Sequence, residues 1–128
     1  MNHFMVTKKS ILLVEDDPLL VKMYKTKFEL EGFEMLIAED GLQALEVVRK
    51  RRPDFLILDV MMPRLSGIEF LEKIKQDANL NSIPVIMLSN LSQPSEREKA
   101  KKLGVKEFLL KANYTPSQVA AFVKKYLS

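Results

Sequence analysis

Residues 10–18 read SILLVEDDP, and residues 54–59 read DFLILD. Each stretch contains a short, unbroken apolar run that ends in carboxylates. Runs of this length and composition are typical of parallel strands whose two faces are both covered by helices. A carboxylate that ends a buried strand is costly to desolvate unless it has a partner. The ends of these two runs are therefore the first candidates for a functional site.

Three further runs bring the number of candidate strands to five, and these alternate with helix-like segments. All but the second of the five are near-continuous apolar strings. The five runs are 10–15, 33–38, 54–59, 84–89 and 105–110. Asp17-Pro18 and Thr115-Pro116 each supply an N-cap residue followed by a proline at the first helical position. The expected helices run from Pro18 to just before Gly32 and span 40–52, 66–76, 92–103 and 117–127. This order predicts an α/β fold, a single doubly wound (βα)5 domain with one parallel sheet over residues 10–128, preceded by a tail at 1–9.

The composition excludes several classes of protein. The chain has 128 residues, 47% of them hydrophobic and 29% charged, which is typical of one globular domain. It has no cysteine, and its one histidine is His3, which argues against thiolate or multi-histidine metal sites and against a Ser-His-Asp triad. No apolar run approaches the roughly 20 residues that span a bilayer, and the first ten residues lack the apolar segment expected of a signal peptide. We therefore expect a cytoplasmic protein that does not associate with membranes. The net charge of +3 comes without a concentrated basic stripe, so no nucleic-acid partner is expected.

Carboxylates gather where two of the predicted strands end. The carboxyl ends of parallel strands share one edge of the sheet, so Glu15, Asp16 and Asp17 would approach Asp59 there. Two like charges about 4 Å apart repel by about 4 kcal/mol at an effective dielectric constant of 20, which a divalent cation or a lysine would offset. Oxygen ligands without sulfur or imidazole select Mg²⁺ or Mn²⁺. Asp17 has a second interpretation as a plain N-cap, and Glu15 as a solvated residue.

Two further strand ends face the same edge. The fourth run ends in Ser89 and the fifth is followed by Lys111. A hydroxyl and an ammonium opposite a metal–carboxylate cluster suit a phosphoryl group. Taken singly, Ser89 reads as a turn residue and Lys111 as an exposed lysine. Their joint placement at successive strand ends is what indicates a phosphoryl site.

At this point the sequence resembles a response-regulator receiver domain of the chemotaxis-protein type, the phosphoacceptor module of two-component signalling. The resemblance extends from Ile11 to Leu127, and its motifs are ILLVEDDP, FLILDVMMPRLSGIEFL, IPVIMLSN and VKEFLLKANYTP. It implies a flavodoxin-like sheet with strand order 2-1-3-4-5. It also implies a stand-alone signalling phosphoacceptor, which is not an enzyme.

The resemblance assigns roles to individual residues. Asp59 resembles the phosphorylated aspartate. Asp16 and Asp17 resemble the acidic pair that binds Mg²⁺ or Mn²⁺ together with Asp59, and the backbone carbonyl of Met61 would be a further ligand. The remaining roles fall to the phosphoryl-binding hydroxyl of Ser89, the ammonium of Lys111 and the switch aromatic Phe108.

The resemblance also implies a mechanism and partners. Asp59 would accept a phosphoryl group from a sensor histidine kinase or a histidine phosphotransfer protein. Ser89 would then move toward that group and Phe108 would rotate inward. The face formed by helix 92–103, the fifth strand and the last helix would change shape and bind a downstream protein that the sequence does not identify. The chain would act as a monomer or as a dimer linked to phosphorylation.

The first helix carries more apolar surface than one buried stripe requires. On a wheel of 100° per residue, Leu19, Met23 and Leu30 fall in a second apolar sector. Leu19 and Met23 either widen the core face or form a docking patch for the kinase. The wheel leaves both interpretations open.

Four positions depart from the family pattern. Ala112 follows Lys111 where the family commonly has a cis proline, so the Lys111–Ala112 bond is either trans or a strained cis bond. Asn90 is larger than the usual residue and would narrow access for phosphodonors. Met61 and Leu91 are apolar and cannot orient a water molecule, which predicts slow loss of the phosphoryl group.

Three rival functions remain to be weighed. A degenerate receiver would be a constitutive interaction module, but every chemical position carries a competent residue. An aspartate-based phosphatase would need a second aspartate where Met61 stands. A flavin carrier would need a loop that cradles phosphate, and the sequence EDDPLL would repel it.

Overall fold

The structure is a computed structural model and describes residues 7–90 and 93–128. Its five strands are β1 (Ser10–Val14), β2 (Glu34–Ala38), β3 (Phe55–Asp59), β4 (Val85–Ser89) and β5 (Glu107–Leu110). They form one parallel sheet in the order β2-β1-β3-β4-β5. The predicted fold and the strand order implied by the resemblance are therefore confirmed. Leu91, Ser92 and the first six residues of the expected tail lie outside the described residues.

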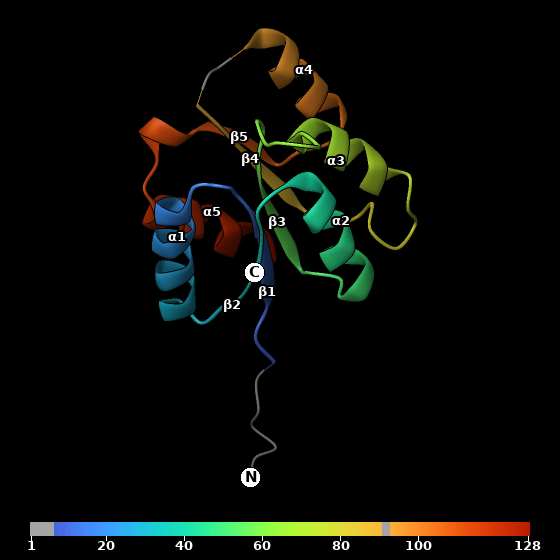
Figure 1. Cartoon of the computed structure of the whole chain (residues 1–128). Coiled ribbons are helices and arrows are strands. Elements are labelled where there is room, and N and C mark those ends of the chain that lie inside the picture. The colour runs from blue at the N-terminus through green and yellow to red at the C-terminus, as the bar shows by residue number, and fades with distance from the viewer. Residues whose placement is uncertain (1–6, 91–92) are drawn as a thin grey trace.

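Five helices cover the two faces of the sheet, as Figure 1 shows. The helices are α1 (Pro18–Leu30), α2 (Gly41–Lys50), α3 (Gly67–Lys75), α4 (Pro94–Lys102) and α5 (Pro116–Leu127). α1 and α5 pack side by side on one face, and α2, α3 and α4 lie on the other. Every helix among the described residues is too short or too polar to cross a bilayer.

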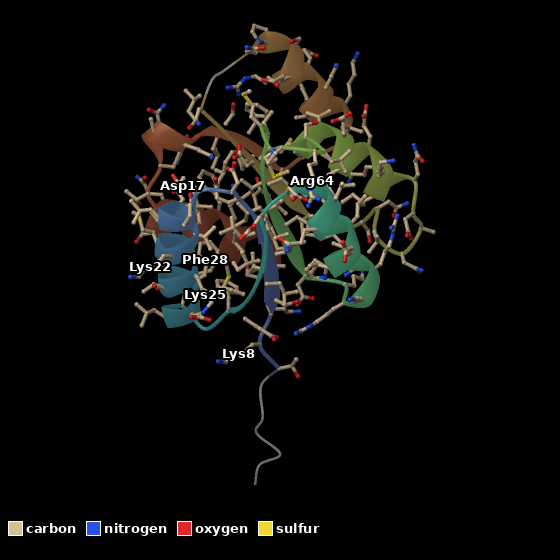
Figure 2. The ribbon with its side chains drawn as sticks, in the orientation of Figure 1. Lys8, Asp17, Lys22, Lys25, Phe28 and Arg64 are labelled. Atoms are coloured by element: carbon tan, nitrogen blue, oxygen red, sulfur yellow. The ribbon has the colours of Figure 1, made fainter. Side chains whose placement is uncertain are left out.

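The unbroken apolar runs exist because both faces of the sheet are buried. Ile11 and Leu13 of β1 contribute to the core under α1 and α5. Their neighbours Leu12 and Val14 point to the opposite face and join the core under α2, α3 and α4. Side chains alternate between the faces of a strand, so each position meets one of two cores. Figure 2 shows Phe28 of α1 directed toward the sheet, where it is fully buried.

The helix ends follow the predicted caps. The Asp17 carboxylate accepts a hydrogen bond from the Leu19 amide at 2.9 Å, and Thr115 forms a reciprocal capping box with Gln118. α4 is the exception, because the described part of this helix buries only Ala100 and begins without a side-chain cap. Among the described residues it buries fewer side chains than any other helix, so we expect it to be the least firmly docked.

Candidate functional site

The candidate site lies at the carboxyl edge of the sheet, where the strand order reverses between β1 and β3. β3 ends at Asp59, and the next residues turn into the loop that leads to α3. Gly67 at the start of α3 lets that loop close tightly, because a Cβ atom there would lie 2.2 Å from the carbonyl oxygen of Asp59. The close approach of Gly67 therefore packs the start of α3 directly against the backbone of Asp59 at the carboxyl edge of the sheet.

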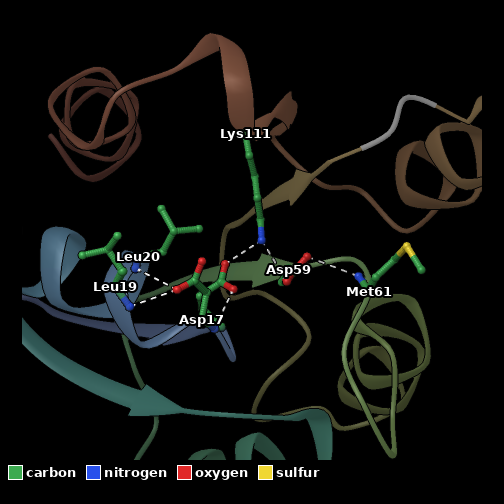
Figure 3. Close-up of polar contacts among 7 residues, drawn as sticks. Asp17, Leu19, Leu20, Asp59, Met61 and Lys111 are labelled. Carbon is green, nitrogen blue, oxygen red and sulfur yellow. Dashed lines mark hydrogen bonds and ion pairs between the residues drawn. The ribbon is translucent and has the colours of Figure 1, made fainter.

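The Asp59 carboxylate is buried, with 5% of the residue exposed. Its Oδ1 accepts a hydrogen bond from the Met61 amide at 3.2 Å, and its Oδ2 accepts one from Lys111 Nζ at 2.9 Å (Figure 3). Burial raises the pKa of Asp59, while the bond from Lys111 opposes that rise. One oxygen is thus held by its own loop, and the other by a residue that is distant in the sequence.

Lys111 binds a second carboxylate. It begins a short 3₁₀ turn, η2 (Lys111–Asn113), directly after β5, and its Nζ lies 2.7 Å from Oε1 of Glu15. Only 2% of Glu15 is exposed, so the interpretation of Glu15 as a solvated residue is wrong. Burial, reinforced by the nearby charge of Asp59, raises the pKa of Glu15. Burial alone would lower the pKa of Lys111, but its bonds to the two carboxylates raise it.

The carboxylates at this edge form a group that could hold a metal ion. Glu15, Asp16 and Asp59 each offer an oxygen, and these oxygens all lie within 4.8 Å of one another. An all-oxygen donor set at this spacing fits a hard divalent cation such as Mg²⁺. Asp16 is exposed, whereas the other two are buried, so the cluster is reached from solvent at Asp16.

Asp17, which is predicted to be a metal ligand, lies outside this group of three carboxylates. Its Oδ1 accepts hydrogen bonds from the Leu19 and Leu20 amides, so its carboxylate caps α1, as its alternative interpretation stated. The acidic group consists instead of Glu15, Asp16 and Asp59. The signal for this was present in the sequence, because an N-cap just before Pro18 leaves the two preceding residues to face the strand ends.

The other predicted site residues end or border the neighbouring strands. Ser89 is the last residue of β4 and is buried, with 1% exposed. Phe108 of β5 is half-buried against the core, and the guanidinium of Arg97 lies 4.9 Å from the centre of its ring. No peptide bond among the described residues is cis, so the Lys111–Ala112 bond is trans.

Leu19 and Met23 lie on the outer face of α1. They are 66% and 44% exposed, so they do not widen the core face. With Leu30 of α1 and Pro116 of α5 they line a groove of about 480 Å³, which Lys22 and Lys27 also border. The interpretation of these two residues as core is therefore wrong.

The model of the response regulator receiver domain family matches residues 11–124. The chain belongs to this family. The receiver domain is 31% identical over 119 residues to the polar-differentiation response regulator DivK of Brucella anthropi, covering 93% of this chain and 96% of that relative. This membership makes the chain a receiver domain of two-component signalling and confirms the family that the sequence resembles.

Solved structures agree with this membership. The chemotaxis response regulator CheY4 of Vibrio cholerae matches the receiver domain with a TM-score of 0.85 at 26% identity, covering 93% of this chain and 98% of that one. The response regulator Rcp1, solved in its Mn²⁺-bound form, matches with a TM-score of 0.76 at 29% identity, covering 80% of this chain and 81% of that one.

Proposed function

We propose that this receiver domain accepts a phosphoryl group on Asp59 from the phosphohistidine of a sensor kinase or phosphotransfer protein. The observation that carries the proposal is the set of contacts that the Asp59 carboxylate makes. Its carboxylate is buried, held by an amide on one oxygen and by an ammonium on the other, and adjoins two further carboxylates. A carboxylate that is only structural does not need an acidic cluster beside it.

The transfer balances without any further reactant. An oxygen of Asp59 attacks the phosphorus, a P–O bond forms and the P–N bond breaks. The histidine, which carries a proton on its other ring nitrogen before transfer, takes the electron pair of that bond and leaves as neutral imidazole. Glu15, Asp16 and Asp59 would hold Mg²⁺, and the backbone carbonyl of Met61 is the further candidate ligand. Bound Mg²⁺ supplies positive charge that offsets the charge on the transferred oxygens.

The residues around Asp59 have separate tasks in this scheme. Lys111, already 2.9 Å from Asp59 Oδ2, would pair with a phosphoryl oxygen once the new group is in place. The hydroxyl of Ser89 would donate a hydrogen bond to the same group. Its movement would give Phe108 room to turn inward and would change the face formed by α4, β5 and α5. The domain would then bind a downstream protein through a population shift between two packings.

The groove beside α1 is the proposed docking site for the phosphodonor. Leu19 and Met23 supply exposed apolar surface, and Lys22 and Lys27 border it. A helix with an apolar stripe and acidic flanks would match both features. α1 starts at the cap of Asp17, directly after the acidic cluster, so a helix docked here would bring its phosphohistidine to the correct edge of the sheet.

Intact mass after incubation with acetyl phosphate tests the function. The wild type should gain one phosphoryl mass only when Mg²⁺ is present, and Asp59→Asn should gain none. No gain, together with no stabilisation by Mg²⁺, would contradict the proposal and would favour a constitutive interaction module.

A second pair of variants tests the metal ligands. Glu15→Gln should weaken Mg²⁺ binding, because it removes a charged oxygen from the cluster. Asp17→Asn should leave it unchanged, because asparagine remains a good N-cap and this side chain lies outside the cluster. Isothermal calorimetry with MgCl₂ measures the Mg²⁺ affinity of both variants. Weaker binding in Asp17→Asn and unchanged binding in Glu15→Gln would instead identify Asp17 as the ligand.

A further inference from the structure

The loop between β3 and α3 contains an unusual backbone conformation. Arg64 has φ of +67°, the one positive φ of a non-glycine residue in the described part of the chain. The Leu65 amide donates to the Pro63 carbonyl at 2.7 Å, so Arg64 is the central residue of a γ-turn-like bend. A left-handed conformation is unfavourable for an L-residue and persists only where the surroundings enforce it.

The side chain of Arg64 contacts the start of α2. Nε and Nη2 of Arg64 lie 3.0 and 2.5 Å from Oδ2 of Asp40. The other oxygen of Asp40 accepts a hydrogen bond from the Gln43 amide at 2.9 Å and caps α2. One carboxylate therefore begins a helix and holds the side chain of the bend. Figure 2 shows Arg64 beside the start of this helix.

The backbones of the two segments also touch. A Cβ atom on Gly41 would lie 2.4 Å from the carbonyl oxygen of Leu65, so the loop rests directly on the first turn of α2. At its other end, the Gly67 amide donates to the Val60 carbonyl at 3.0 Å. The loop is held from two sides, and Met61 lies within it.

We propose that Asp40 and Arg64 are positioning residues that hold the loop of Met61 against the phosphoacceptor. This inference rests on the proposed function. Their contact keeps the strained bend closed, which holds the Met61 amide on Oδ1 of Asp59 and fixes the loop that carries the Met61 carbonyl, the further candidate ligand. When the contact is lost, the bend relaxes and the loop moves away from the site.

Variants that remove the contact while sparing the backbone test the proposal. Arg64→Asn removes the cation, and asparagine tolerates a positive φ. Asp40→Asn removes the charge but retains an oxygen that can cap α2. Arg51→Gln is the matched control, since it breaks the exposed Arg51–Glu34 ion pair, whose glutamate begins β2 at the opposite edge of the sheet from the site.

Two readouts separate positioning from simple stability. The Kd for Mg²⁺, measured by calorimetry with MgCl₂, should rise about two- to fivefold in Arg64→Asn and in Asp40→Asn, the range of a partly exposed ion pair. The double variant should show no further rise, because the two residues act as one contact. Hydrogen exchange of the Met61 amide, measured without metal, should accelerate in both single variants. Arg51→Gln should change neither readout.

The outcomes are distinguishable from failure of the proposed function. A wild type that binds no Mg²⁺ or accepts no phosphoryl group would contradict that function, yet Met61 exchange would still decide the positioning role. Unchanged Met61 exchange in both single variants, or equal changes in Arg51→Gln, would overturn the inference. A Kd that rises additively in the double variant would overturn it as well.

Discussion

Lys111→Met removes the ammonium group that pairs with both Glu15 and Asp59 at the centre of the site. Methionine keeps most of the length of lysine and removes its charge, so Glu15 and Asp59 lose the ammonium that lies 2.7 and 2.9 Å from their oxygens. Oxygens of the two carboxylates lie within 4.8 Å of each other. At an effective dielectric constant of 20, two unit charges at that separation repel by about 3.5 kcal/mol.

We expect Lys111→Met to lower the free energy of unfolding by about 3 to 5 kcal/mol at pH 7 without Mg²⁺, as for other buried pairs that lose one partner. The loss should shrink at lower pH. Without the lysine, the pKa of each carboxylate in the folded protein rises further above its unfolded value. The destabilisation is then complete above the folded pKa and disappears as both carboxylates protonate toward about pH 4. Added Mg²⁺ should stabilise the variant more than the wild type.

Urea unfolding followed by circular dichroism, at several pH values between 7 and 4, measures these differences. Lys124→Met is the matched control, because Lys124 pairs with Glu31 at the surface and its removal changes the net charge equally. That variant should lose less than about 1 kcal/mol at every pH. Equal losses for the two variants, or a loss in Lys111→Met that does not depend on pH, would refute the reasoning.

Three further predictions concern neighbouring residues. Burial, with the charge of Glu15, raises the pKa of Tyr24 to about 12, so the wild type should lose about 2 kcal/mol of unfolding free energy as the pH rises from 10 to 12. Tyr24→Phe should lack this loss, and superimposable pH profiles would contradict it. Gly67→Ala places a methyl group 2.2 Å from the Asp59 carbonyl oxygen and should cost about 1 to 3 kcal/mol in thermal unfolding, whereas a variant as stable as the wild type would show that the loop yields freely. Met61→Asn adds an amide that can orient water, so the aspartyl phosphate should decay severalfold faster by mass spectrometry. An unchanged half-life would count against a role of Met61 in phosphoryl lifetime.

Most of the fold could be predicted because its signals are local. The apolar runs mark strands buried on both faces, and the caps at Asp17 and Thr115 mark where α1 and α5 begin. A cap needs only its own first turn, and a strand pattern needs only its own residues. The structure accordingly changes element bounds by only a few residues.

The different roles of Glu15, Asp16 and Asp17 rest on a weaker sequence signal, the N-cap position of Asp17 before Pro18. Three consecutive carboxylates have similar intrinsic properties, and their roles depend on where the chain turns from β1 into α1. Glu15 enters the buried site and Asp17 caps the helix. A strand that ended one residue later would have placed Asp16, in place of Glu15, in the buried position.

The sequence by itself determined the succession of strands and helices along the chain, the helix starts and the carboxylates that end the first and third strands, because each of these depends on neighbouring residues in the chain. Only the tertiary structure decided that Lys111 bridges Glu15 and Asp59, and that Asp40 holds Arg64. These contacts join residues of separate βα units, and their energies depend on burial and on distances of a few ångströms. Such quantities exist only after the sheet has brought the strand ends together.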